Sequence, residues 1–258
     1  MIQCYPCPVC GNKSTNILPV LNPTPPEDTF TQKKNKLEIK PLDTSCCISC
    51  GLIFLNTQLD PNLSYSEYLY NSSTTIGLKS HFYKRASGLI DLYKVQPEDT
   101  ILDLGCNDGS FLLAFKKIGF LNIYGIEPAP EPFLLAKKQN LSINNCYFDK
   151  KWVDQNTNLN PKLITANYMF ANIPNPLDFL KQCSRIMTRD TVLSIETGYH
   201  PIQFSKNMID YIYHEHFFYF TIKSLNIMAD NCNLNIISVR QNEHKGGSIE
   251  VDFKKRDS

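Results

Sequence analysis

The sequence predicts an α/β protein with a doubly wound, mostly parallel sheet and a small metal-binding module at its N-terminus. Two observations predict this fold class. From residue 100 onward, short apolar runs alternate with helical patterns, which is the order of a parallel sheet whose strands are joined by helices. Ahead of them, six of the ten cysteines fall within the first fifty residues. We therefore expect a zinc-binding module at 1–60, an aromatic linker and helix at 61–95, and the main domain at 96–258.

The composition narrows the class of protein. A hydrophobic fraction of 42% and a charged fraction of 20% over 258 residues are ordinary for a globular chain and argue against disorder. The formal charge of +1 argues against a general nucleic-acid or anionic-membrane binder. No apolar run approaches the roughly 18 residues of a membrane helix, and the first residues lack the apolar core of a signal peptide. We expect a cytoplasmic protein with no nucleic-acid and no membrane partner.

Four cysteines have the spacing of metal ligands. Cys7 and Cys10 form one CxxCG knuckle, and Cys47 and Cys50 form a second. Two residues between thiolates allow one tight turn to aim both sulfurs at one ion, and two knuckles supply the four soft ligands that tetrahedral Zn²⁺ favours. Free or redox-active thiols are the alternative. With all four positions filled by protein, the zinc would be structural.

The rest of the first sixty residues predicts a loop, a strand and two cysteines that are not ligands. The loop between the knuckles, around 22–36, is rich in proline and lysine and has too little apolar periodicity for a core element. The segment 52–55 predicts a strand that closes the module. Cys46 adjoins a ligand and should point elsewhere, which leaves Cys46 and Cys4 as spare thiols.

The main domain is expected to alternate strands and helices. The strands are predicted at 100–105, 122–127, 143–148, 163–166, 192–196, 236–240 and 248–253, and the helices at 78–93, 110–118, 131–139, 177–187 and 224–230. The last two strands are separated by too few residues for a crossover, so they should form an antiparallel hairpin.

The loop after the first strand separates two nucleotide-binding architectures. A dinucleotide site needs G-x-G-x-x-G, whereas Gly105 and Gly109 are spaced G-x-x-x-G. The pattern D-x-G-x-N-x-G from Asp103, with Glu127 at the end of the next strand, instead resembles the first motifs of class I S-adenosylmethionine (SAM) methyltransferases. A strand, turn and helix of some other α/β protein, with Glu127 merely solvated, is the alternative.

The resemblance implies where the cofactor would lie. Glycine-rich backbone can approach the methionine part of SAM, Glu127 can accept both ribose hydroxyls, and Asp103 would lie near the cationic end. The cofactor-binding residues implied are Asp103, Gly105, Asn107, Asp108, Gly109, Glu127 and Asn167.

The segment from Tyr213 to His216 is the most unusual one in the chain. If it is extended, Tyr213 and Glu215 share one face and His214 and His216 share the other. Three interpretations remain open: an aromatic packing segment, a metal pair formed by the two histidines, and acid–base chemistry by an imidazole near neutral pKa.

Taken together, the motifs resemble the zinc-containing sugar C-methyltransferases, which methylate C3 of nucleotide-linked 4-keto-deoxysugars. The matching features are the two CxxCG knuckles, Tyr68-x-Tyr70-x-Ser72 ahead of His81, Leu104-Gly-Cys-Asn-Asp-Gly109, Ile126-Glu-Pro-Ala129, Tyr213-His-Glu-His216 and Lys245-Gly-Gly-Ser-Ile249. They span nearly the whole chain.

The resemblance implies a mechanism. His216 would be the base, with Tyr213, Glu215 and Tyr70 binding or polarising the sugar. A proton next to a ketone is acidified by enolate formation, and the resulting carbanion attacks the methyl group of SAM. Zinc would take no part in the reaction.

The chain departs from this family in two places. Asn172 stands where the family has a histidine, and an asparagine cannot exchange a proton at neutral pH. The family also normally continues as a further domain beside the sugar-nucleotide site, whereas this sequence ends at Ser258. A SAM-binding remnant, a chain completed by a separate subunit and a zinc-bearing RNA methyltransferase therefore stay as alternatives.

Overall fold

A seven-stranded sheet forms the centre of the molecule. The computed structural model describes residues 5–13, 15–17, 21–26, 39–60, 70–208 and 210–256. The strand order is β12-β13-β10-β9-β6-β7-β8. Their bounds are β6 Ile101–Leu104, β7 Ile123–Ile126, β8 Ser142–Asn144, β9 Leu163–Asn167, β10 Val192–Gly198, β12 Leu234–Asn242 and β13 Ser248–Lys255.

The direction of the strands confirms the predicted fold class. The pairs β10·β9, β9·β6, β6·β7 and β7·β8 are parallel, and β13 runs antiparallel to both β10 and β12. The last two strands therefore form the expected antiparallel hairpin. The sheet is that of a class I methyltransferase fold.

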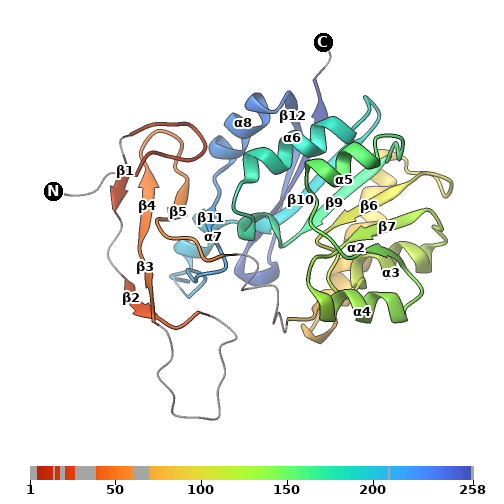
Figure 1. Cartoon of the computed structure of the whole chain (residues 1–258), viewed down its shortest axis with the longest axis horizontal. Helices are drawn as coiled ribbons and strands as arrows, with labels where there is room; N and C mark the ends of the chain where they lie inside the picture. The colour runs from red at the N-terminus through yellow and green to blue at the C-terminus, as the bar shows by residue number, and fades with distance from the viewer. Residues whose placement is uncertain are drawn as a thin grey trace.

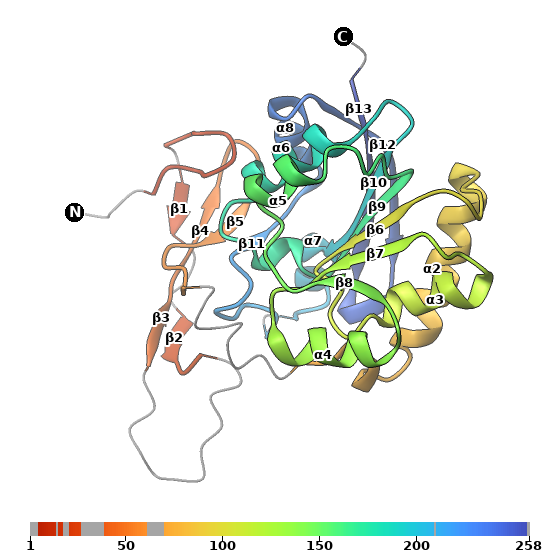
Figure 2. The same ribbon diagram turned by 45° about the vertical axis from the view of Figure 1, so that its right-hand side comes forward.

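Helices cover both faces of this sheet (Figures 1 and 2). On one face, α2 (Leu78–Tyr93), α3 (Ser110–Ile118) and α4 (Pro130–Lys138) enclose one apolar core. On the other face, α5 (Lys150–Gln155), α6 (Pro176–Ile186) and α8 (Ile222–Asn231) pack over a second, larger core.

Two short helices, α5 and α7 (His200–Ser205), were not predicted, and one strand is shorter than expected. The predicted strand 143–148 ends at Asn144, because the side chain of Asn145 turns back to donate to the backbone carbonyl of Glu127 at 2.9 Å. The carboxylate of Asp149 then caps α5 by accepting from the backbone N–H of Trp152. Local side-chain bonds of this kind compete with strand pairing.

The crevice for a ligand follows from the order of the strands. The chain leaves β6 toward β7 on one side and later returns to β9 on the other, so the connections on the two sides of β6 diverge. In open α/β sheets, ligands bind at this switch point, beyond the carboxyl ends of the strands.

The N-terminal module, drawn in red and orange in Figure 1, forms a sheet of its own together with β11, which is drawn in blue. Its strands are ordered β1-β4-β5-β11, and β2 and β3 form a separate pair. The bounds are β1 Thr15–Ile17, β2 Leu21–Thr24, β3 Lys40–Leu42, β4 Thr44–Cys47, β5 Ile53–Leu55 and β11 Phe218–Tyr219.

The proline- and lysine-rich loop around 22–36 has no buried residue in its described part, 22–26. Beyond this loop, Leu42 and Thr44 are buried, because short strands that were not predicted lie on both sides of Asp43 and pair with neighbours that the sequence does not place nearby. These strands have three or four residues, too few for a periodic pattern to appear.

Among the described residues, none of the helices has the length and apolar character that crossing a membrane requires.

Candidate active site

The four cysteines predicted as ligands gather in one cluster, with their Sγ atoms all within 4.8 Å of one another. The sulfurs of Cys7 and Cys50 are 3.6 Å apart, and those of Cys10 and Cys47 are 3.5 Å apart. A zinc–sulfur bond of about 2.3 Å places the sulfurs of a tetrahedral site about 3.8 Å from one another. The donor set therefore fits a tetrahedral metal with no open position.

The two knuckles have the same backbone geometry. The glycine after each knuckle, Gly11 or Gly51, donates its N–H to the carbonyl of the first cysteine, at 2.9 and 2.8 Å. Both glycines have left-handed φ angles of 70° and 72°, which ordinary residues rarely adopt. The Sγ of Cys46 faces the carbonyl of Cys47 and lies outside the cluster, as expected. Cys4 falls outside the described residues.

A cavity of about 410 Å³ lies beyond the carboxyl ends of β6, β7 and β9. Of the predicted site residues, it is lined by Tyr70, Asp103, Gly105, Asn107, Glu127 and Asn167. A Cβ atom at Gly105 would lie 2.9 Å from the Cγ of Met169, so this position requires glycine. The glycine-rich loop therefore lets the backbone form part of the cavity wall.

Asp103 lies at the bottom of this cavity in a polar cluster. Its Oδ1 accepts from the hydroxyl of Thr165 at 2.7 Å and from the amide of Asn167 at 3.1 Å. Asn167 in turn accepts from the Nε of Arg85 at 2.9 Å. Burial raises the pKa of Asp103 to about 7, although these hydrogen bonds and the charge of Arg85 oppose the rise. A cation placed beside Asp103 would favour the ionised form.

Glu127 follows β7 and faces the same cavity. Its Oε1 accepts from the N–H of Ala129 and its Oε2 from the N–H of Asn107, both at 2.8 Å. Burial raises the pKa of Glu127 to about 7. Each oxygen keeps a further lone pair, so the carboxylate can still accept from a pair of hydroxyl groups, which fits a ribose.

Asn107 joins three parts of the site. It adopts a left-handed φ of 51°. Its Oδ1 accepts from the N–H of Ser72 at 2.8 Å, and its Nδ2 donates to the carbonyl of Tyr70 at 3.0 Å. Asn107 thereby holds the segment that carries Tyr70 against the loop and against Glu127.

Asp108 and Gly109 do not line this cavity. The carboxylate of Asp108 accepts from the backbone N–H groups of Ser73 and Ser110. Gly109 is needed for packing, because a Cβ atom there would lie 2.3 Å from Leu141, and its φ is 78°. The structure thus gives both residues a supporting position beside the predicted cofactor site.

The segment from Tyr213 to His216 is a turn and not an extended chain, so the condition for the alternation of faces is not met. The N–H of His216 donates to the carbonyl of Tyr213 at 3.1 Å, which closes the turn. Tyr213 and His216 therefore meet, with 2.7 Å between the phenol oxygen and Nε2 and 4.0 Å between ring centroids. His214 points away toward the carbonyl of Lys40, 3.3 Å from its Nε2.

This arrangement disfavours two of the interpretations left open by the sequence. The two histidines diverge, and among the described residues only the four cysteines form a group of three or more candidate metal ligands. His216 and Tyr213 instead line a small cavity of about 50 Å³. Glu215 lines neither this cavity nor the larger one.

The hydrogen bonds of His216 define its protonation. Its Nδ1 is 3.3 Å from the carbonyl of Tyr211, which can only accept, so Nδ1 carries the hydrogen. Nε2 then holds the lone pair and accepts from the phenol of Tyr213. Enclosure of the ring, reinforced by the charge of Lys245, lowers the pKa of His216 to about 3. The imidazole is therefore neutral at pH 7, although so low a pKa makes it a weak base in this arrangement.

The turn is held between the module and the main sheet. The carbonyl of Phe217 accepts from the N–H of Leu55, and its own N–H donates to the carbonyl of Ala171. Directly after it, β11 pairs with β5. The hydroxyl of Thr221 donates to the carbonyl of Cys50 at 2.6 Å. The N-terminal module thus forms part of the support for His216.

Two residues that sequence reasoning missed as site residues, Tyr168 and Lys245, line both cavities. They form the wall between the predicted cofactor site and the Tyr213–His216 pair. The ammonium of Lys245 lies 4.3 Å from the ring centroid of Tyr168 and 4.9 Å from that of Tyr70. The two glycines that follow Lys245 were the available signal, because they mark a tight backbone turn.

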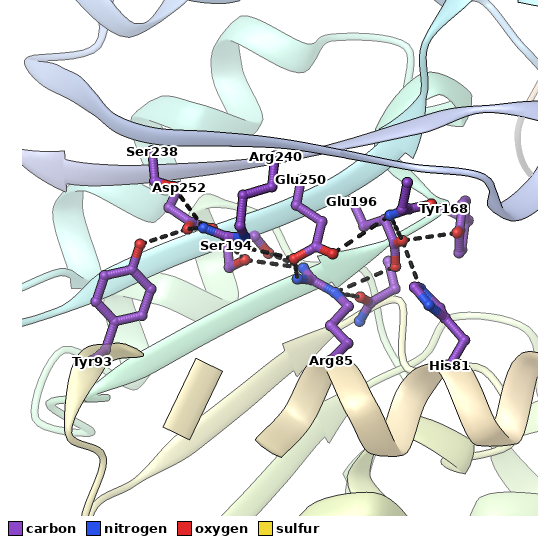
Figure 3. Close-up of polar contacts among 12 residues, drawn as sticks. His81, Arg85, Tyr93, Tyr168, Ser194, Glu196, Ser238, Arg240, Glu250 and Asp252 are labelled. Atoms are coloured by element: carbon purple, nitrogen blue, oxygen red, sulfur yellow. Dashed lines mark hydrogen bonds and ion pairs between the residues drawn. The ribbon is translucent and has the colours of Figure 1, made fainter. Parts of the chain in front are cut away.

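A buried polar network fixes Tyr168 (Figure 3). The phenol of Tyr168 donates to the Oε1 of Glu196 at 2.9 Å, and His81 and Asn242 bond the same oxygen at 2.7 and 2.8 Å. Burial opposes ionisation of Glu196, yet the hydrogen bond from His81 and the charge of Arg85 outweigh it and lower its pKa. The network extends through α2, β10, β12 and β13, so the site is braced by the core of the domain.

Asn172, where the resembled family has a histidine, also lines the larger cavity. Its side chain is 8% exposed, and its Oδ1 has no hydrogen-bond partner among the described residues. A buried amide oxygen without a partner costs free energy. Its position is therefore suited to receive a donor from a ligand.

The fold and the site define a class of protein, and comparison with known proteins agrees. Residues 78–239 match the family described as a methyltransferase domain, and the chain belongs to this family. The match runs from the first residue of α2 into β12. Together with the seven-stranded sheet, it confirms the predicted enzyme class, a SAM-dependent methyltransferase.

The chain is also similar to the C-methyltransferase NovU of Streptomyces niveus. The two are 25% identical over 213 residues, which is 82% of this chain and 50% of NovU. The chain thus spans about half the length of this curated relative.

Solved structures support the fold. A SAM-dependent methyltransferase from Clostridium acetobutylicum has a TM-score of 0.55 at 13% identity, with 72% of this chain and 94% of that one covered. Magnesium protoporphyrin IX methyltransferase from Synechocystis, with bound S-adenosylhomocysteine, has a TM-score of 0.55 at 10% identity, with 75% and 92% covered.

Proposed function

We propose that the protein is a C-methyltransferase that acts on the carbon next to a ketone, in a nucleotide-linked keto-deoxysugar methylated at C3. The observation that carries the proposal is the neutral Tyr213–His216 pair, which adjoins the cavity that fits SAM. The similarity to NovU, itself a C-methyltransferase, supports the reaction type. The nucleotide-sugar substrate rests on the resemblance of the motifs.

Each site residue would have a separate role in the proposed methyl transfer. SAM would supply the methyl group as an electrophile. Asp103, Asn167 and Glu127 would bind the cofactor at the strand ends. Nε2 of His216 would take the proton from the substrate carbon, while the Nδ1–H bond to the carbonyl of Tyr211 keeps the ring in the tautomer that leaves Nε2 free to accept.

The phenol of Tyr213 has a defined part in this step. It donates to Nε2 in the resting protein, so it must turn its hydrogen elsewhere when the imidazole accepts the substrate proton. The carbonyl oxygen of the substrate is the acceptor available at that moment. Tyr213 would therefore polarise the ketone as the base acts, and Tyr70 and Asn172, which line the larger cavity beside it, would be further binding groups.

We also propose that the four thiolates hold a structural zinc ion. The sulfur distances and the closed donor set support it. Its contribution would be to fold the module that supports the turn.

The test of the function is turnover on a TDP-4-keto-deoxysugar with labelled SAM, together with solvent exchange of the C3 hydrogen. In His216→Asn, SAM affinity should persist while both methyl transfer and exchange fall by roughly 10²–10⁴, because the amide cannot take the proton. His214→Asn is the matched control, since it removes an imidazole from the same turn on the side of the module. If His216→Asn exchanges and methylates at near the original rate per folded molecule, His216 is not the base.

A further inference from the structure

Lys245 occupies a place that the reaction as proposed leaves without a role. Among the described residues that line the two cavities, it is the only cation. It stands in the wall between them, with the cofactor residues on one side and the Tyr213–His216 pair on the other. A substrate carbon that reaches both His216 and the methyl donor must pass beside it.

The ammonium is held in place without being neutralised. It lies over the faces of Tyr70 and Tyr168, an arrangement that attracts a cation through the ring electrons. No carboxylate among the described residues forms an ion pair with it. Burial and the neighbouring charge of Glu196 raise the pKa of Tyr168, so its phenol stays neutral and is no counter-ion.

The backbone that presents Lys245 is built for this position. Lys245 has a left-handed φ of 48°, a conformation that is strained for a residue with a side chain. Gly246 and Gly247 follow with positive φ, and a Cβ atom on either would lie 2.5 Å from a side-chain carbon, of Met208 or Ile202. The amide of Gln203 donates to the carbonyl of Lys245 at 3.2 Å.

Tyr168, the other half of the wall, is equally constrained. Its φ is 55°, and its phenol donates to Glu196 within the network of Figure 3. Backbone strain of this kind persists where surrounding structure enforces it, as at ligand-binding sites. Two left-handed residues from distant parts of the chain thus meet at one place between the cavities.

Removing a proton next to a ketone places a negative charge on the carbonyl oxygen. In an enclosed cavity such a charge is costly unless a cation or a set of donors already faces it. We propose that the ammonium of Lys245 pairs with this oxygen and stabilises the enolate of the substrate. The assignment rests on the proposed function, and it deepens that function by naming the electrophile.

The step balances as follows. The electron pair of the C–H bond becomes the carbon–carbon π bond of the enolate, and the carbonyl π pair moves onto the oxygen beside Lys245. The proton goes to Nε2 of His216. The enolate carbon then bonds to the methyl group of SAM, whose sulfur keeps the electrons of the broken bond, and the proton on His216 leaves to solvent.

The test compares Lys245→Met, which keeps the length and loses the charge, with Lys245→Arg, which keeps the charge. Lys138→Met on the exposed surface of α4 is the matched control. In Lys245→Met, exchange of the C3 hydrogen and methyl transfer should both fall by about 10²–10³, with SAM affinity and the KM for the sugar little changed. Lys245→Arg should restore part of the rate, and Lys138→Met should behave as the original protein.

A second measurement does not depend on turnover. The charge of Lys245 helps to lower the pKa of His216. The pKa of the His216 imidazole, measured by NMR, should therefore rise in Lys245→Met and remain unchanged in Lys138→Met. Tyr213, Tyr211 and Tyr219, which also face this imidazole, are intact in both variants.

The outcomes distinguish a failure of the Lys245 assignment from a failure of the proposed function. If the original protein is active and Lys245→Met exchanges and methylates at a similar rate, Lys245 is not the electrophile, while the proposed function stands. A raised KM with unchanged kcat also overturns the assignment, because the ammonium would then bind an anionic part of the ground-state substrate. If the original protein neither exchanges nor methylates any keto-sugar nucleotide, the function and the assignment fail together.

Discussion

At the scale of single residues, the carboxyl group of Glu127 shows how burial prepares a side chain for a ligand. Burial raises its pKa to about 7, so at neutral pH it is divided between the neutral and the ionised form. The ionised form is the better acceptor for ribose hydroxyls. Binding of SAM should therefore favour loss of the proton, and the affinity should increase as the pH rises through 7.

The substitution Glu127→Gln tests this. At pH 8 it should weaken SAM binding by about 1.5–3 kcal/mol, the scale of a hydrogen bond to a charged group. It should also flatten the dependence on pH, though not abolish it, because the pKa of Asp103 is raised to about 7 as well. Calorimetric titration between pH 6 and 8 measures both effects.

A nearby acid provides the control. Glu131 lies in the first turn of α4 and is exposed, so Glu131→Gln should leave the affinity and its pH dependence unchanged. Equal slopes for Glu127→Gln and the original protein would mean that another group causes the pH dependence.

At the scale of elements, Gly109 illustrates how one residue decides the packing of several. It ends the loop after β6 and precedes α3 with a φ of 78°. A Cβ atom added to Gly109 would lie 2.3 Å from the Cδ1 of Leu141 and 3.3 Å from the Cβ of Ala136. The glycine therefore lets α3 approach the segment between α4 and β8.

We expect Gly109→Ala to destabilise the fold by roughly 2–5 kcal/mol, the sum of the left-handed backbone and of overpacking. Gly88 in α2 is the control, since it is exposed, has ordinary helical geometry and has open space around its missing Cβ. Gly88→Ala should stabilise by about 0.5–1 kcal/mol. Urea denaturation measures both, and a Gly109→Ala protein of unchanged stability would contradict the packing role.

Prediction from sequence succeeded for elements whose own pattern defines them. The helix predicted at 110–118 is α3 with the same bounds, and the glycine-rich loop and the strands around it carry apolar runs with clear ends. The YHEH turn was not predicted, because its shape depends on partners from elsewhere. These are Leu55 from the module, Ala171 from the 3-10 helix after β9 and Lys40 beside His214.

The same difference between local patterns and distant partners explains which site residues could be predicted from the sequence and which could not. The cysteine knuckles and the Asp103–Gly109 loop are local in sequence, and spacing alone brings their residues together. The wall between the cavities joins Tyr168 and Lys245, whose association depends on the order of strands in the sheet. No local pattern marks such a pair.

At the scale of the whole molecule, the N-terminal module and the turn that carries His216 are joined by strand pairing and hydrogen bonds. β11 completes the sheet of the module, and Thr221, the N-cap of α8, bonds the second knuckle. Loss of the proposed zinc ion should therefore disturb the turn that carries His216, while the cavity proposed to bind SAM, beyond β6, β7 and β9, keeps its structure.

The variant Cys47→Ser should contain less than one zinc per chain, bind SAM with near-normal affinity and lose methyl transfer. Cys46→Ser is the matched control, because this neighbouring thiol lies outside the cluster and should leave metal content and turnover unchanged. Metal analysis, calorimetry and a turnover assay on both proteins decide the point. Full activity in a metal-free Cys47→Ser protein would show that the module does not support the turn.

The pairing of β5 with β11 also determines when the sheet of the module can be completed during translation. Ile53 leaves the ribosome early, whereas its partner Tyr219 follows only after most of the main domain. At about 5–20 residues per second, roughly ten seconds or more separate them. During this interval the nascent module has an unpaired strand edge, the kind of edge that invites pairing with other chains. The module is thus translated before the main domain but completed only after most of that domain has been made.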